Sequence, residues 1–154
     1  MNNIDIITKF YSAFTEGNSE AMIECYHDDI IFEDPAFGRL EGKRAKAMWQ
    51  MLLSQKTSEV NVTYNNIESE NSTGQASWVA RYNYGLQKRK VTNKVSANFK
   101  FKDGKIIHHK DSFDLWAWSR QALGAAGYLL GWTPFMRKKI QKTTGARLDK
   151  YMRK

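Results

Sequence analysis

Residues 91–115 read VTNKVSANFKFKDGKIIHHKDSFDL. Apolar and polar side chains alternate on both sides of Asp103-Gly104, a dipeptide typical of the tight turn between two antiparallel strands. Successive strand residues point to opposite faces of a sheet, so the odd-numbered residues after the turn share one face. That face is expected to hold Ile107, His109, Asp111 and Phe113.

The alternation continues upstream through residues 60–65 and 77–84, which predicts two more antiparallel strands. Towards the N-terminus the apolar period lengthens to three or four residues, which indicates helices. Helices are predicted over residues 4–16, 20–26 and 45–53, with a short strand over 30–34 and a loop over 37–42. Helices followed by an antiparallel meander are typical of an α+β fold, in which the helices pack on one face of a curved sheet.

The C-terminal part is expected to be helical again. Residues 116–130 form one predicted helix, and Pro134 suits the first turn of a second helix that ends near Tyr151. This last helix is amphipathic, and residues 134–154 carry eight bases and one acid. Residues 1–42 carry two bases and nine acids instead, so the formal net charge of +8 is unevenly distributed.

The chain length of 154 residues suits a single domain, and one cysteine cannot form an internal disulfide. The N-terminus lacks the pattern of a signal peptide, and the apolar stretch 123–132 is shorter than the about 20 residues of a membrane-spanning helix. A cytoplasmic location is therefore expected. No nucleic-acid-reading motif accompanies the basic residues, so we expect no nucleic-acid partner.

Three stretches of the chain belong together by order and spacing. They are FYSAFTEGN with YHDDIIFEDP at residues 10–18 and 26–35, LEG at 40–42, and KDSFDL at 110–115. The set resembles the NTF2-like superfamily, which includes ketosteroid isomerase, limonene-1,2-epoxide hydrolase and the SnoaL-like polyketide cyclases. The resemblance covers residues 4–116, so we expect an NTF2-like domain over 1–116 and a helical extension of the same domain over 117–154.

The resemblance implies a cone-shaped (cystatin-like) fold, in which a bent antiparallel sheet and the N-terminal helices enclose an apolar pocket. A small hydrophobic molecule is the expected occupant of this pocket. The pocket is expected to be lined by Phe10, Phe14, Phe32, Trp49, Asn83, Ala97, Phe99 and His109. Proteins of this fold include enzymes, binding modules and transport factors, so the fold does not settle the function.

Asp111 lies on the apolar face of the last predicted strand, and a buried carboxylate needs a partner. We expect this partner to be Arg81, because a guanidinium keeps its charge and can bridge two carboxylates. Asp34, before Pro35, is the candidate second carboxylate. The predicted acid/base site depends on these three side chains meeting inside one apolar hollow.

The resemblance to limonene epoxide hydrolase assigns the general base to Asp111 and the arginine to Arg81. Asn83 stands where that enzyme has its proton-donating aspartate, and an amide is no general acid at neutral pH. Phe32 and Asp34 replace its water-positioning tyrosine and asparagine. The resemblance therefore does not predict epoxide hydrolysis by that mechanism.

The resemblance to ketosteroid isomerase assigns the proton-shuttling base to Asp34, whereas Phe10 and Ala97 replace the two oxyanion-hole donors. Steroid isomerisation is therefore not expected either. The remaining set indicates isomerisation, hydration or aldol-type cyclisation of a small molecule. The alternative is that Asp34 only caps a turn and Asp111 only pairs with Arg81, in which case the protein is a non-catalytic carrier or sensor.

Partners other than the small molecule are inferred from the surface. Trp78, Tyr82 and Tyr84 are expected on the convex face of the sheet, where they would form a homodimer interface. The basic C-terminal helix could bind an anionic membrane surface or an acidic partner. The favoured interpretation is a helix folded across the mouth of the cone or across the dimer interface, with its charges in solvent. His108 and His109 point to opposite strand faces, so neither a metal nor another cofactor is expected.

Overall fold

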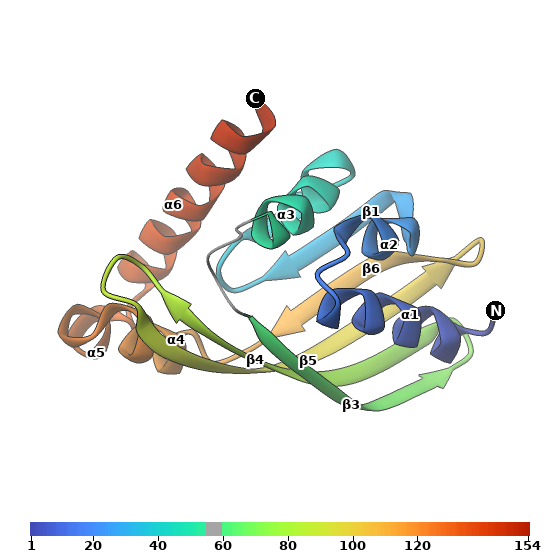
Figure 1. Ribbon diagram of the computed structural model, residues 1–154, viewed down its shortest axis with the longest axis horizontal. Helices are drawn as coiled ribbons and strands as arrows, with labels where there is room; N and C mark the ends of the chain where they lie inside the picture. The colour runs from blue at the N-terminus through green and yellow to red at the C-terminus, as the bar shows by residue number, and fades with distance from the viewer. Residues whose placement is uncertain (55–59) are drawn as a thin grey trace.

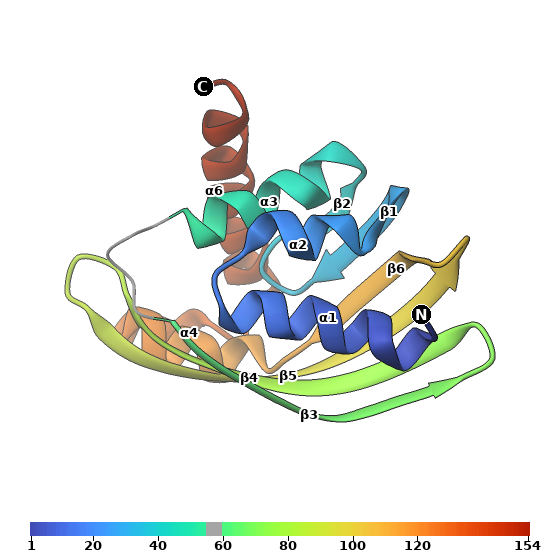
Figure 2. The same ribbon diagram turned by 45° about the vertical axis from the view of Figure 1, so that its right-hand side comes forward.

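The computed structural model describes residues 1–54 and 60–154. It has an α+β fold in which helices lie on a curved six-stranded sheet (Figures 1 and 2). In chain order the elements are α1 (Asn3–Thr15), α2 (Ser19–Glu24), β1 (Tyr26–Asp34), β2 (Gly38–Glu41), α3 (Lys43–Leu53), β3 (Asn61–Glu70), β4 (Thr73–Tyr84), β5 (Arg89–Lys102), β6 (Lys105–Ser112), α4 (Leu115–Leu123), α5 (Ala125–Leu130) and α6 (Pro134–Met152). The predicted α+β class is confirmed.

The strand order in the sheet is β2-β1-β6-β5-β4-β3. From β3 to β6 consecutive strands are antiparallel, as tight turns between neighbours require. β1 pairs parallel with β6. These two strands are far apart in the chain and no hairpin connects them, so their pairing need not be antiparallel. The sheet is therefore mixed, whereas the sequence analysis predicts an antiparallel sheet.

Three element boundaries differ from the predictions. β1 begins at Tyr26, which the predicted second helix includes. β2 forms over residues 38–41, within the predicted loop, because its backbone pairs with β1. The predicted helix over residues 116–130 is two helices, since Gly124 at φ +65° takes a conformation that ends a helix.

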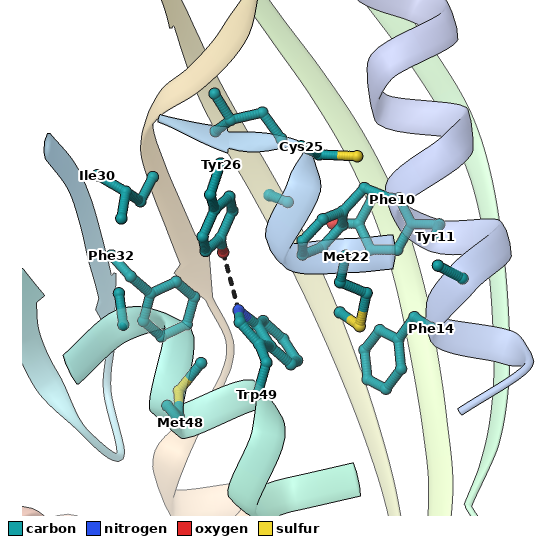
Figure 3. Packing of buried hydrophobic residues seen from close by; sticks show 14 of the residues in the cluster. Phe10, Tyr11, Phe14, Met22, Cys25, Tyr26, Ile30, Phe32, Met48 and Trp49 are labelled. Atoms are coloured by element: carbon teal, nitrogen blue, oxygen red, sulfur yellow. Dashed lines mark hydrogen bonds between the residues drawn. The ribbon is translucent and has the colours of Figure 1, made fainter. Parts of the chain in front are cut away.

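The core lies between the concave side of the sheet and α1, α2 and α3 (Figure 3). The ring of Phe10 contacts those of Tyr26 and Trp49 with centroids 5.4 and 5.6 Å apart. Most side chains expected to line a pocket are buried in this core: Phe10, Phe14, Phe32, Trp49, Ala97, Phe99 and His109. The aromatic rings among them contact one another, so they stabilise the fold as a hydrophobic core.

The aromatic residues of β4 are on the concave side, and the predicted convex position is wrong. Trp78 packs against Phe14 of α1, with ring centroids 5.2 Å apart. Tyr82 and Tyr84 follow on the same face and contact Trp118 of α4. Strand alternation shows which residues share a face, but the packing of helices decides which face is inside. These side chains pack within the fold and do not form an exposed surface for a homodimer.

The C-terminal helices fold back onto the domain. Leu148 of α6 is fully buried in the main core, and Thr144 Oγ1 donates to the carbonyl of Ala36 between β1 and β2. Arg44 of α3 and Asp149 of α6 form an ion pair. The tail is therefore a helix that packs on α3 and on the turn between β1 and β2. Within the described residues, no helix is both long and apolar enough to span a membrane.

Candidate active site

Asp34 and Asp111 lie at the carboxyl ends of the adjacent strands β1 and β6. In the parallel register Phe32 lies beside His109 and Glu33 beside Lys110. The next two residues are Asp34 and Asp111, on the core side of both strands. Both carboxylates line a hollow of about 360 Å³. Its other lining residues include the charged Glu33, Arg39, Lys110 and Arg137 and the apolar Pro35 and Phe113.

A chain of buried hydrogen bonds leads from the core to Asp111. Trp49 Nε1 donates to the Tyr26 hydroxyl over 2.9 Å (Figure 3), and this hydroxyl lies 2.7 Å from His109 Nδ1. His109 Nε2 lies 2.8 Å from Asp111 Oδ1. His109 is fully buried and Asp111 is only 3% exposed. His109 therefore supplies the buried carboxylate with the polar partner that it requires.

The direction of this chain follows from its donors and acceptors. Burial raises the pKa of the Tyr26 phenol well above its usual value, so the hydroxyl keeps its proton. The hydroxyl accepts from Trp49 and donates to Nδ1 of His109, which leaves the imidazole proton on Nε2. Nε2 then donates to Asp111. This tautomer satisfies every group in the chain and holds the Asp111 carboxylate in one orientation.

Asp34 caps a turn and also has a raised pKa. Its Oδ1 accepts the backbone N–H of Phe37, so it caps the turn between β1 and β2 as one alternative had predicted. Burial nevertheless raises the pKa of the Asp34 carboxyl to about 7, and the charge of Asp111 acts in the same direction. The site thus holds one carboxyl group that is still partly protonated near neutral pH and a second that accepts from a histidine.

The hydroxyl of Tyr26 is expected to contribute strongly to stability. In Tyr26→Phe the indole N–H of Trp49 and Nδ1 of His109 both lose their partner inside the core. Two buried unsatisfied groups cost about 2–4 kcal/mol of unfolding free energy. Urea denaturation should show this loss, whereas Tyr64→Phe, at a half-buried ring stacked on Tyr11, should change stability by less than about 1 kcal/mol. Equal losses in the two variants would contradict the hydrogen-bond chain.

The structure does not bring together the three side chains that the sequence analysis combined. Arg81 is exposed on the opposite face of β4 from the buried Trp78 and Ala80, so its predicted pairing with Asp111 is wrong. Asn83 is exposed on the same outer face, so it does not line a pocket. The alternation of β4 places both side chains outside once Trp78 packs inward.

Tyr26 and the bonding role of His109 are the parts of the site that sequence reasoning missed. Tyr26 was assigned to a helix, although Ile30, Phe32 and Asp34 follow it at even positions with the period of a strand. Extending the strand to include Tyr26 would have placed its ring on the core face beside Phe32. The contact with His109 also needed the parallel neighbour β6, which the sequence pattern did not reveal.

The fold and the carboxylate pair define a class of α+β proteins with a curved sheet and a candidate acid/base site at the ends of two parallel strands. Residues 7–109, about two thirds of the chain, match the model of the SnoaL-like domain family. The chain therefore belongs to the SnoaL-like family, as the resemblance to the NTF2-like superfamily predicts. No curated protein matches the chain in sequence.

Solved structures share this fold at low sequence identity. TerC, co-crystallised with polyporic acid, has a TM-score of 0.65 and 16% identity over 77% of this chain and 96% of its own. An LEH-like epoxide hydrolase from M. tuberculosis has a TM-score of 0.65 and 19% identity over 82% and 92%. A protein with a ketosteroid isomerase-like fold from Catenulispora acidiphila, in complex with trimethylamine, reaches 0.66 and 18% over 84% and 97%. At these identities the likeness concerns the fold alone.

Proposed function

We propose that the protein is an enzyme that uses Asp34 and Asp111 for acid/base chemistry on a small molecule. The observation that carries the proposal is the pair itself: two carboxyl groups in one hollow, one with a pKa raised to about 7 and the other bound by a buried histidine. Neighbouring carboxyl groups whose environments differ are a common arrangement for a general acid and a general base. The SnoaL-like family membership is consistent with this chemistry.

The geometry suggests a role for each group. Asp111, oriented by His109, accepts a proton from the substrate, and Asp34 in its protonated form donates one to a substrate oxygen. Lys110 and Arg137 border the same hollow and supply positive charge near a developing oxyanion. His109 touches Asp111 and not the hollow, so it is a positioning residue.

The lining of the hollow suggests the class of substrate. Pro35 and Phe113 offer apolar contacts, while the charged residues favour a molecule that also carries an oxygen function. A small ketone, enol or epoxide with an apolar body meets both requirements. We propose isomerisation, hydration or aldol-type cyclisation of such a molecule.

A substrate panel tests this function. The protein is incubated with small ketones, enol esters, epoxides and linear poly-β-ketones, and the products are identified by mass spectrometry and NMR. Conversion is expected for at least one class, and its rate should fall as the pH rises past the Asp34 pKa of about 7, since the acid then loses its proton. A rate that stays constant through this range would remove Asp34 as the acid.

The outward position of Arg81 and Asn83 favours a second candidate, a non-catalytic carrier or sensor that uses the same hollow. Neither the Arg81 guanidinium nor the Asn83 amide then helps to stabilise a transition state at Asp111. Calorimetry with the same panel distinguishes the two functions: saturable binding of a compound that is recovered unchanged supports the carrier and contradicts the enzyme.

A further inference from the structure

The surface at one end of the molecule is strongly apolar. Helix α5, the segment from its end into the first turn of α6, and one residue of α4 expose six large side chains, which we call the apolar tip: Trp116, Tyr128, Leu129, Leu130, Trp132 and Phe135. Leu129, Trp132 and Phe135 are each exposed by 66–68%. Figure 1 shows α5 at one extreme of the long axis of the molecule. Such a concentration of exposed aromatic and aliphatic groups is characteristic of a binding surface.

The tip is held in place by close packing on α4. A Cβ atom added at Gly127 would lie 1.9 Å from the carbonyl oxygen of Ser119, so only glycine allows the two helices to approach this closely. The indole N–H groups of Trp116 and Trp132 donate to the carbonyls of Tyr128 and Leu129. The tip is therefore a folded element whose polar groups are satisfied while its apolar groups remain exposed.

Positive charges predominate in the part of the chain that carries the tip. Residues 114–148 contain six lysines and arginines and one acid, Asp114, which caps α4. The turn between β4 and β5 and the first two residues of β5, together residues 85–90, carry three more bases and the fully exposed Leu86. Arg89, the first residue of β5, donates to the carbonyl of Gln121 in α4, which places this end of β5 beside the C-terminal helices. Exposed apolar side chains and nearby lysines and arginines are the two features by which proteins bind anionic membrane surfaces.

We propose that the apolar tip binds the surface of an anionic lipid bilayer. Its tryptophan and tyrosine rings suit the lipid headgroup region, and the surrounding bases suit anionic headgroups. A second copy of the chain would bring the same positive charges face to face, so self-association at the tip is disfavoured. Helix α6 buries Met136, Ile140 and Leu148 within the fold, so the contact uses the tip and leaves this helix folded on the domain.

Flotation with vesicles tests the proposal. The purified protein is mixed with vesicles of phosphatidylcholine alone, or of equal parts phosphatidylcholine and phosphatidylserine, and floated through a density gradient. It should float with the anionic vesicles and remain behind with the neutral ones. Combining Leu129→Ser with Trp132→Ser, both on the surface, should weaken binding at least about tenfold. Combining Lys138→Glu with Lys139→Glu should also weaken it about tenfold or more.

Matched controls change the same residue types elsewhere. Ile4→Ser with Leu52→Ser removes exposed apolar side chains of α1 and α3, and Lys100→Glu with Lys102→Glu reverses exposed charges on β5. Both control variants should bind anionic vesicles more tightly than their counterparts at the tip, and circular dichroism should show that all variants are folded. Equal losses in control and tip variants would overturn the proposal.

Other outcomes would also overturn it. Failure to float with anionic vesicles contradicts it directly, and retention on poly-glutamate without flotation identifies an acidic protein as the partner instead. A dimer in analytical ultracentrifugation that the Leu129→Ser and Trp132→Ser changes abolish would make the tip an interface between two copies of the chain. Flotation that is equal with neutral and anionic vesicles would contradict the part assigned to the basic residues.

Discussion

Turnover is expected to fall about a hundred- to ten-thousand-fold in Asp111→Asn, the usual contribution of a general base. The amide oxygen of asparagine can still accept from His109 Nε2, so the hydrogen-bond chain and the fold should persist. The amide does not accept a proton at neutral pH, so only the chemistry is removed. The measurement is the rate with any compound that the substrate panel shows to be converted, together with the thermal midpoint of each variant.

A control and a second readout make the Asp111 prediction specific. Glu70→Gln makes the same chemical change at an exposed end of β3 and should leave the rate unaltered. The charge of Asp111 raises the pKa of Asp34, so NMR titration of Asp111→Asn should show a lower Asp34 pKa than the about 7 of the unaltered protein. Retained turnover would remove Asp111 from the mechanism, and an unchanged Asp34 pKa would show that the two carboxyl groups are not coupled.

The fold is largely predictable because its signals are local. Asp103 and Gly104 adopt positive φ values of 54° and 73°, as the tight turn predicted from this dipeptide requires. One extra residue in β6 shifts the register near Phe101, so Ile106 is buried in place of the predicted Ile107. Beyond this bulge the alternation is regular, and His109 lies on the inner face as predicted.

The site was only half predictable because its contacts are not local. The alternation of β6 identifies Asp111 as a buried carboxylate, and a proline marks the turn at Asp34. The pairing of β1 with β6 joins residues about 80 positions apart, and no pattern in either segment encodes a parallel register. The sequence pattern therefore favours a charged partner for Asp111, whereas the partner in the structure is the buried His109, two residues away.

In the C-terminal extension, too, local sequence patterns predict the helices, whereas contacts with distant residues decide which side chains are buried. Its helices follow from Pro134 and from the apolar spacing, and the structure confirms them. Which of their side chains become buried depends on contacts with α3 and with the turn between β1 and β2. Helix α6 uses its apolar side within the fold, while α5 remains exposed.

Asp34→Asn is expected to stabilise the protein at alkaline pH. The folded-state pKa of Asp34 is about 7, above the value of about 4 for an unfolded aspartate, so the folded state binds the extra proton between these values. The contribution of Asp34 to stability is therefore fully present below about pH 4 and is lost as the pH rises through about 7. About three pKa units correspond to at most about 4 kcal/mol, and because Asp34 is partly exposed we expect a loss of about 2–3 kcal/mol.

Asparagine keeps the turn, since its oxygen also accepts the Phe37 N–H, but it never ionises. Urea denaturation at about pH 8 should therefore show Asp34→Asn to be more stable than the unaltered protein by about 2–3 kcal/mol, with little difference near pH 4. Asp28→Asn is the opposite control: a hydrogen bond from Lys46 lowers the pKa of Asp28, so this carboxylate stabilises only when charged, and its removal cannot help at high pH. A loss of stability in Asp34→Asn at about pH 8 would show that the charged form of Asp34 is well accommodated, and Asp34 could then not serve as the acid.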